Sequence, residues 1–153
     1  MKTIEEEQGK FSLVFFYMGS VSMFLVITVA SCTSRETFAE LYNLVAGFLS
    51  LSNTSFSMTL RDSPGLGHFL CYALLCFSLS GIFSHRSVII APLVAVGFGV
   101  LMEIAQVFIP SRDASILDIL INGVGVIVGL GLFLLIKRFR RPAGSGRYPL
   151  SRG

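Results

Sequence analysis

Four apolar runs, each close to the length of a membrane span, follow one another along the chain with polar links between them. They cover about residues 11–30, 66–83, 88–109 and 116–136. A helix of about 20 apolar residues crosses the ~30 Å hydrocarbon layer of a bilayer. Because lipid offers the backbone no hydrogen-bond partners, each run has to be helical. The pattern therefore predicts an all-α integral membrane protein with four transmembrane helices.

Prolines and short links indicate how the last three spans pack. Ser63 and Pro64 suit the cap and the first turn of the second span, and Pro110 stops the third. The links at about residues 84–87 and 110–115 are short. Helices joined by such short links are antiparallel neighbours. We therefore expect the second, third and fourth spans to pack side by side.

The first link, at about residues 31–65, is much longer and contains a helical pattern of its own. Apolar side chains recur at three- and four-residue spacing at Phe38, Leu41, Val45 and Phe48, with polar residues on another face. This spacing predicts an amphipathic helix. The helix either lies along the membrane surface, which we favour, or covers the mouth of the bundle.

The residues before this link leave two interpretations of the N-terminus. Val29-Ala30-Ser31-Cys32 has the form of a lipoprotein cleavage site. The apolar run before it is long for a signal peptide, however, and glutamates at residues 5–7 stand where basic residues are expected. We therefore favour an uncleaved membrane anchor.

Composition supports the membrane assignment. The chain is 53% hydrophobic and only 14% charged, against about 25% charged residues in a soluble domain. These values exclude a disordered chain and argue against an ordinary soluble enzyme. The 153 residues suffice for one domain. We expect a membrane domain at residues 1–136 and a basic tail at 137–153.

The distribution of Lys and Arg indicates the orientation. With four spans, both termini and the middle link lie on one side, which carries nine Lys and Arg residues, whereas the other side carries Arg35, Arg61 and Arg112. The positive-inside rule then makes both termini cytoplasmic. Because the basic tail follows an apolar run directly, it is interpreted as a membrane-flanking anchor attracted to anionic lipids. Nucleic acid is not expected as a partner.

Three ionisable side chains inside the apolar runs, His68, Glu103 and Asp118, are candidates for function because each is costly in hydrocarbon. Glu103 lies seven residues before Pro110, roughly 10 Å from the outer end of its span. We expect the other two near the same end. Further polar residues lie three or four positions from these, on the same helix faces: Tyr72, Gln106 and Asn122.

Arg112 lies in the short link above Glu103 and Asp118. It is expected either to pair with one of these carboxylates or to bind an anionic group from the outer leaflet. Each candidate also has a structural interpretation. Asp118 completes a capping box with Ser115, and Gln106 and Asn122 suit hydrogen bonds between helices.

The remaining motifs indicate packing rather than chemistry. Gly125 and Gly129 form a GxxxG pattern, which is typical of close helix contacts. Cys32, Cys71 and Cys76 form no disulfide framework and no metal-ligand spacing. His68, Glu103 and Asp118 are of types that can bind a metal, but they are widely separated in sequence. We expect no metal and no cofactor.

Together these residues resemble the signature of the VanZ-like family, small bacterial membrane proteins named for a teicoplanin-resistance accessory protein. The later element reads Glu103-x-x-Gln106-x-x-x-Pro110-x-Arg112-x-x-Ser115-x-x-Asp118-x-x-x-Asn122, followed by Gly125 and Gly129, and the earlier one is His68-Phe69-x-x-Tyr72-x-x-Leu75. The resemblance covers about residues 62–130. The family pattern has an Asp-Lys pair with the aspartate four residues before the histidine, whereas Asp62 is six before His68 and no lysine follows it.

The resemblance implies a multi-pass protein of the bacterial cytoplasmic (inner) membrane, connected with the cell envelope, antibiotic resistance or glycopeptide tolerance. Our leading hypothesis is a binding or accessory protein whose outward-facing polar site takes an anionic envelope lipid or surface precursor. The alternatives are a structural subunit with a membrane-protein partner, and a membrane enzyme using Glu103 as acid or base on a lipid-linked substrate. In each case membrane lipids are partners.

Overall fold

The computed structural model describes residues 2–48, 64–84, 88–109 and 114–139. In these ranges the chain is helical and contains no strand. The helices are α1 (Lys2–Cys32), α2 (Arg35–Phe48), α4 (Pro64–Ile82), α5 (Ile90–Gln106) and α6 (Ile116–Phe139).

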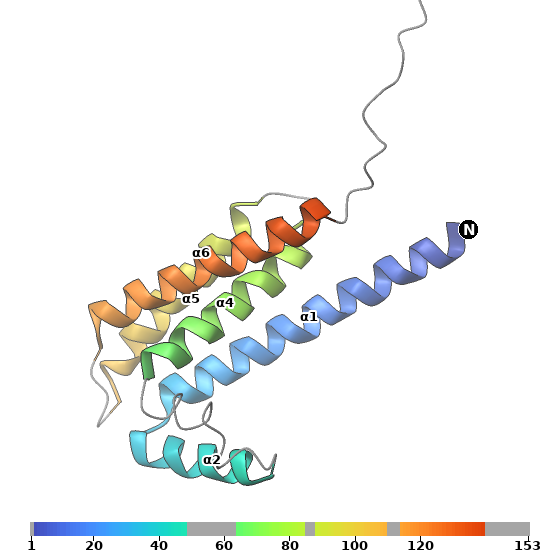
Figure 1. The fold of residues 1–153 in the computed structure, drawn as a ribbon. Helices are drawn as coiled ribbons and strands as arrows, with labels where there is room; N and C mark the ends of the chain where they lie inside the picture. Colours follow the sequence, from blue (N-terminus) through green and yellow to red (C-terminus); the bar gives the residue numbers. More distant parts are fainter. Residues whose placement is uncertain (1, 49–63, 85–87, 110–113, 140–153) are drawn as a thin grey trace, which may run out of the picture.

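Helices α1, α4, α5 and α6 form the bundle (Figure 1). The figure shows that α4 and α6 begin, and α5 ends, at the end of the bundle where α1 finishes. Three segments, Gly9–Cys32, Gly65–Ile82 and Ile116–Phe139, are long and apolar enough to cross a membrane. With the shorter apolar helix α5, they confirm the prediction of an all-α membrane protein with four spanning helices.

The third span differs from expectation at its end. We expected a helix to about residue 109, but α5 ends at Gln106 after 17 residues, a length of about 25 Å. The next three N–H groups donate to carbonyls three residues earlier: Val107 to Ile104, Phe108 to Ala105 and Ile109 to Gln106. Such tight turns rise about 2 Å per residue and commonly close a helix. With them the segment again reaches roughly the thickness of the hydrocarbon layer.

Helix α4 is the centre of the bundle, since it contacts α6 most extensively and α1 and α5 as well. Its Tyr72, Leu75 and Cys76 are the largest fully buried side chains. Large apolar side chains on the outer faces are exposed, as Leu101 on α5 and Ile127 on α6 illustrate. In water this much exposed apolar surface would favour aggregation. In a bilayer it is the surface that lipid covers.

The α4–α6 contact depends on two glycines. A Cβ at Gly125 would meet the carbonyl oxygen of Phe69, and a Cβ at Gly129 would meet the carbonyl group of Ala73. Both neighbours are α4 backbone, which cannot rotate away as a side chain can. The GxxxG spacing of these glycines therefore brings the two helix backbones together, as small residues do between membrane helices.

Aromatic packing holds α1 against the bundle. The ring of Phe16 lies directly over Gly81 of α4, leaving no room for a Cβ there. Further along α1, the rings of Phe24 and Phe98 of α5 meet edge to face with centroids 4.7 Å apart. Edge-to-face ring pairs at this distance stabilise the contact beyond the effect of burying apolar surface.

Helix α2 confirms the helix predicted in the first link. Ser34 caps it, because the Ser34 hydroxyl oxygen accepts the N–H of Thr37 at 3.2 Å. Figure 1 shows α2 beyond the end of the bundle, next to the end of α1. Within the described residues it makes no extensive contact with the other helices. The membrane-surface position remains a prediction.

We predict that Gly129→Ala lowers the free energy of unfolding by about 1–3 kcal/mol, the usual cost of overpacking. The matched control is Gly131→Ala on the same helix, where a Cβ meets nothing within 4 Å. Unfolding in detergent by addition of dodecyl sulfate, followed by circular dichroism, measures both variants. Equal stability of the two variants would contradict the close α4–α6 contact.

Candidate functional site

Six polar side chains lie at the end of the bundle where α4 and α6 begin and α5 ends. We call them the polar cluster, and they are His68 and Tyr72 on α4, Glu103 and Gln106 on α5, and Asp118 and Asn122 on α6. All six are residues that the sequence singles out. The antiparallel order of the three helices brings them to one level.

Glu103 is bound to the start of α6. It is 3% exposed, and its Oε2 accepts the backbone N–H of Ser115 at 3.1 Å. The first N–H groups of a helix lack partners within the helix, and their end of the helix dipole favours negative charge. A carboxylate from α5 therefore satisfies a free donor of α6. The bond joins two helices across the link between them.

This contact alters the capping box expected at Ser115. The hydroxyl half is present, since Ser115 Oγ accepts the N–H of Asp118 at 3.4 Å. In the full motif, the side chain at Asp118 would accept the N–H of Ser115 in return. Here Glu103 accepts that N–H instead. The carboxylate of Asp118, which is partly exposed, is thus not used for this bond.

A second hydrogen bond links α4 to α6. Nδ1 of His68 lies 3.2 Å from Oδ1 of Asn122. Because an amide oxygen only accepts, Nδ1 is the donor, and a neutral ring then keeps Nε2 as an acceptor. Asn122 is 3% exposed, whereas His68 is partly exposed. His68, itself partly exposed, is thus held by a buried partner.

Tyr72 and Gln106 complete the buried part of the cluster. Tyr72 is 1% exposed and Gln106 is 3% exposed. The Tyr72 ring lies over Gly99, where a Cβ would come within 3.2 Å of it. The cluster therefore has a buried layer, formed by Tyr72, Glu103, Gln106 and Asn122, and a partly exposed layer, formed by His68 and Asp118.

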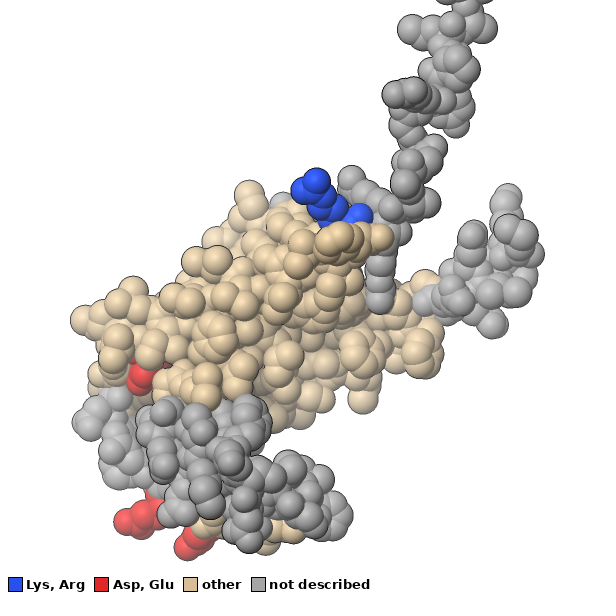
Figure 2. Space-filling view, viewed as in Figure 1, with Lys and Arg blue, Asp and Glu red and all other residues tan. Residues whose placement is uncertain are grey.

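The charged side chains that the structure describes are divided between the two ends of the molecule. Figure 2 shows basic side chains where α6 finishes and acidic side chains at the opposite end and on α2. The acidic side chains that the structure describes are Glu36, Glu40, Glu103 and Asp118. If α6 ends on the cytoplasmic side, the basic side chains lie on that side, as the positive-inside rule requires.

Two sequence-selected residues, Arg112 and Asp62, fall outside the described residues, and so does the predicted pair of Arg112 with a carboxylate. Among the residues that the structure does describe, no group of three or more His, Cys, Asp and Glu side chains is arranged to hold a metal ion.

Sequence reasoning missed two pairings. It grouped His68 with Tyr72 and Asp118 with Asn122 along single helices, whereas the hydrogen bonds join His68 to Asn122 and Glu103 to Ser115 across helices. Helical spacing identifies residues on one face but does not identify the facing partner. The short link between α5 and α6 was the available signal, because it brings the start of α6 next to the end of α5.

The fold and this cluster define a multi-pass helical membrane protein with polar residues gathered at one end of the bundle. The family model described as VanZ/LLP1 matches residues 11–137. This match includes α4, α5, the polar cluster and most of α1 and α6, and the chain therefore belongs to the VanZ/LLP1 family. The comparisons with curated proteins and with solved structures find no match.

Proposed function

We propose that the protein is an accessory protein of the bacterial envelope that binds the head group of an anionic envelope lipid or lipid-linked surface precursor at the polar cluster. The observation that supports this most is the layering of the cluster. His68 and Asp118 are partly exposed above four buried polar side chains. Polar groups at membrane depth are costly, and those that line an accessible site are commonly functional.

The proposal gives the two layers different tasks. The buried layer fixes the ends of three helices through the Glu103–Ser115 and His68–Asn122 bonds. The partly exposed layer offers Nε2 of His68 as an acceptor and the Asp118 carboxylate for hydroxyl or amine groups of the ligand. Arg112, three residues before Ser115, supplies the cation for a phosphate. A neutral or zwitterionic lipid would use only part of this set.

The orientation belongs to the same proposal. With both termini on the cytoplasmic side of the bacterial inner membrane, the polar cluster faces the outer leaflet, where lipid-linked precursors of the cell surface are used. Nine Lys and Arg residues on one side against three on the other support this orientation. Membership of the VanZ/LLP1 family supports a link to glycopeptide tolerance as the physiological role.

A structural subunit is the second candidate, and one specific contact favours it. The Glu103 carboxylate is 3% exposed and occupied by the N–H of Ser115, so it serves helix packing whether or not a ligand binds. This geometry gives less support to Glu103 as the acid or base of an enzyme, because a catalytic carboxyl group has to reach its substrate.

Removal of Arg112 distinguishes the two candidates. Native mass spectrometry of the purified protein in mild detergent, with undecaprenyl phosphate added, measures the retained lipid. We expect Arg112→Ala to lower retention by about tenfold or more, the cost of a charge-assisted hydrogen bond. The matched control is Arg61→Ala, which removes the same charge from the same side of the membrane and is expected to retain the lipid. Full retention by Arg112→Ala, or lower melting temperatures without any lipid adduct, would favour the structural subunit.

The orientation predicts which thiols meet a reagent outside the cell. Cys32 is exposed at the end of α1, on the side that we propose to face outward. A membrane-impermeant maleimide should label Cys32 in intact spheroplasts, and Cys32→Ser should abolish the label. A cysteine placed in the tail, Gly146→Cys in the Cys32→Ser background, should react only after permeabilisation. The opposite pattern would invert the proposed orientation.

A further inference from the structure

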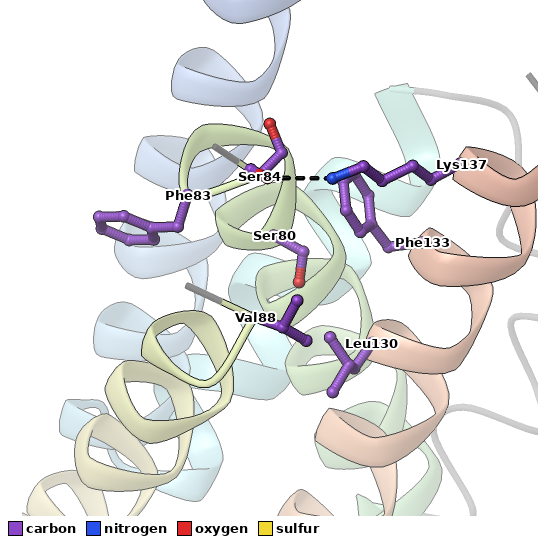
Figure 3. A pocket seen from close by; sticks show the side chains of 7 residues that line it. All are labelled: Ser80, Phe83, Ser84, Val88, Leu130, Phe133 and Lys137. Atoms are coloured by element: carbon purple, nitrogen blue, oxygen red, sulfur yellow. Dashed lines mark hydrogen bonds between the residues drawn. The ribbon is translucent and has the colours of Figure 1, made fainter. Parts of the chain in front are cut away.

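A hollow at the end of the bundle opposite the polar cluster combines a fixed cation with apolar walls (Figure 3). The described residues that define this basic-end hollow are Ser80, Phe83, Ser84, Val88, Leu130, Phe133 and Lys137. They come from the end of α4, the segment before α5 and the last part of α6. Among the residues that the structure describes, Lys137 is the only charged one that lines it.

The ammonium group of Lys137 is held in place. Its Nζ donates to the carbonyl oxygen of Ser84 at 2.9 Å and lies 5.9 Å from the centre of the Phe133 ring. The Ser84 carbonyl follows the end of α4, where the helix dipole favours a cation. An ammonium group has three N–H donors. The Ser84 bond uses one of these, so the group can donate to a further acceptor without leaving its place.

Charge at this end selects an anion. Arg138 follows Lys137 and is exposed. Of the acidic side chains that the structure describes, those of Glu103 and Asp118 lie at the other end of the bundle and those of Glu36 and Glu40 on α2. An anion at Lys137 therefore has no described carboxylate beside it.

The walls of the hollow select a ligand with an apolar part. Val88 is 47% exposed, and Leu130 and Phe133 are partly exposed beside it. These side chains lie just before α5 and in the second half of α6. The enclosed space is about 10 Å³, no more than one water molecule requires. A ligand would therefore have to lie over the hollow, with its charge at the rim.

We infer that the basic-end hollow binds an anionic phospholipid, with the phosphate on Lys137 and the start of an acyl chain over Val88 and Leu130. Phosphate oxygens accept strong charge-assisted hydrogen bonds from an ammonium group. The site is separate from the polar cluster and does not depend on its ligand. Under the orientation proposed above, the lipid belongs to the cytoplasmic leaflet.

Native mass spectrometry of the full-length protein in detergent tests the site with three probes. Phosphatidylglycerol carries the charge and the chains, phosphatidylcholine has matched chains without net charge, and glycerol 3-phosphate has the phosphate without chains. We expect the protein to retain phosphatidylglycerol and neither of the other two probes. Lys137→Gln should lower that retention by about tenfold or more. The control Arg138→Gln should lower it by no more than about fivefold, the general effect of one basic residue near an anionic surface.

A second variant guards against loss of folding, because Lys137→Gln also removes the bond to Ser84. Val88→Phe keeps Lys137 and covers the hollow with a larger side chain, so it should lower retention of phosphatidylglycerol while the melting temperature stays unchanged. Equal losses in Lys137→Gln and Arg138→Gln would overturn the site in favour of unspecific charge attraction. If glycerol 3-phosphate binds as well as phosphatidylglycerol, the ligand is a free phosphate compound and not a lipid. If Val88→Phe retains phosphatidylglycerol fully, the lipid does not bind over the hollow.

Discussion

The buried carboxylate of Glu103 imposes the strongest constraint on this structure. A carboxylate inside a bilayer has to be paired with a donor, and the donor here is the Ser115 N–H at the start of α6. The bond fixes the end of α5 against the beginning of α6. Because α6 packs on α4 through Gly125 and Gly129, the position of α5 is tied to the whole bundle. The packing of these three helices places the side chains of the polar cluster at the same end of the bundle.

At each end of the bundle, a charged side chain forms a hydrogen bond with a free backbone group of a neighbouring helix end. At one end, Glu103 satisfies a free N–H at the start of a helix. At the other end, Lys137 satisfies a free carbonyl after the end of a helix. Each pairing matches the sign of the helix dipole. Among the side chains that the structure describes, the acidic and basic groups lie towards opposite ends of the bundle.

Much of the fold could be predicted from the sequence, because hydropathy and backbone hydrogen bonding leave few choices in a bilayer. The apolar runs, the helix in the first link and the role of the GxxxG glycines follow from spacing alone. The end of α5 could not be predicted, since Pro110 marks where a helix must stop and not where tighter turns begin. The pairs His68–Asn122 and Glu103–Ser115 could not be predicted either, because they depend on how one helix is rotated against another.

The most direct test of the account is amide hydrogen exchange in the first turn of α6, at Ser115 to Ile119. We expect Glu103→Ala to raise exchange there strongly, because the Ser115 N–H loses its acceptor and the turn loses its anchor to α5. The matched control is Ile104→Ala, which shortens the neighbouring exposed side chain and should leave this turn protected. Equal protection of the turn in both variants would contradict the central role of the Glu103–Ser115 bond.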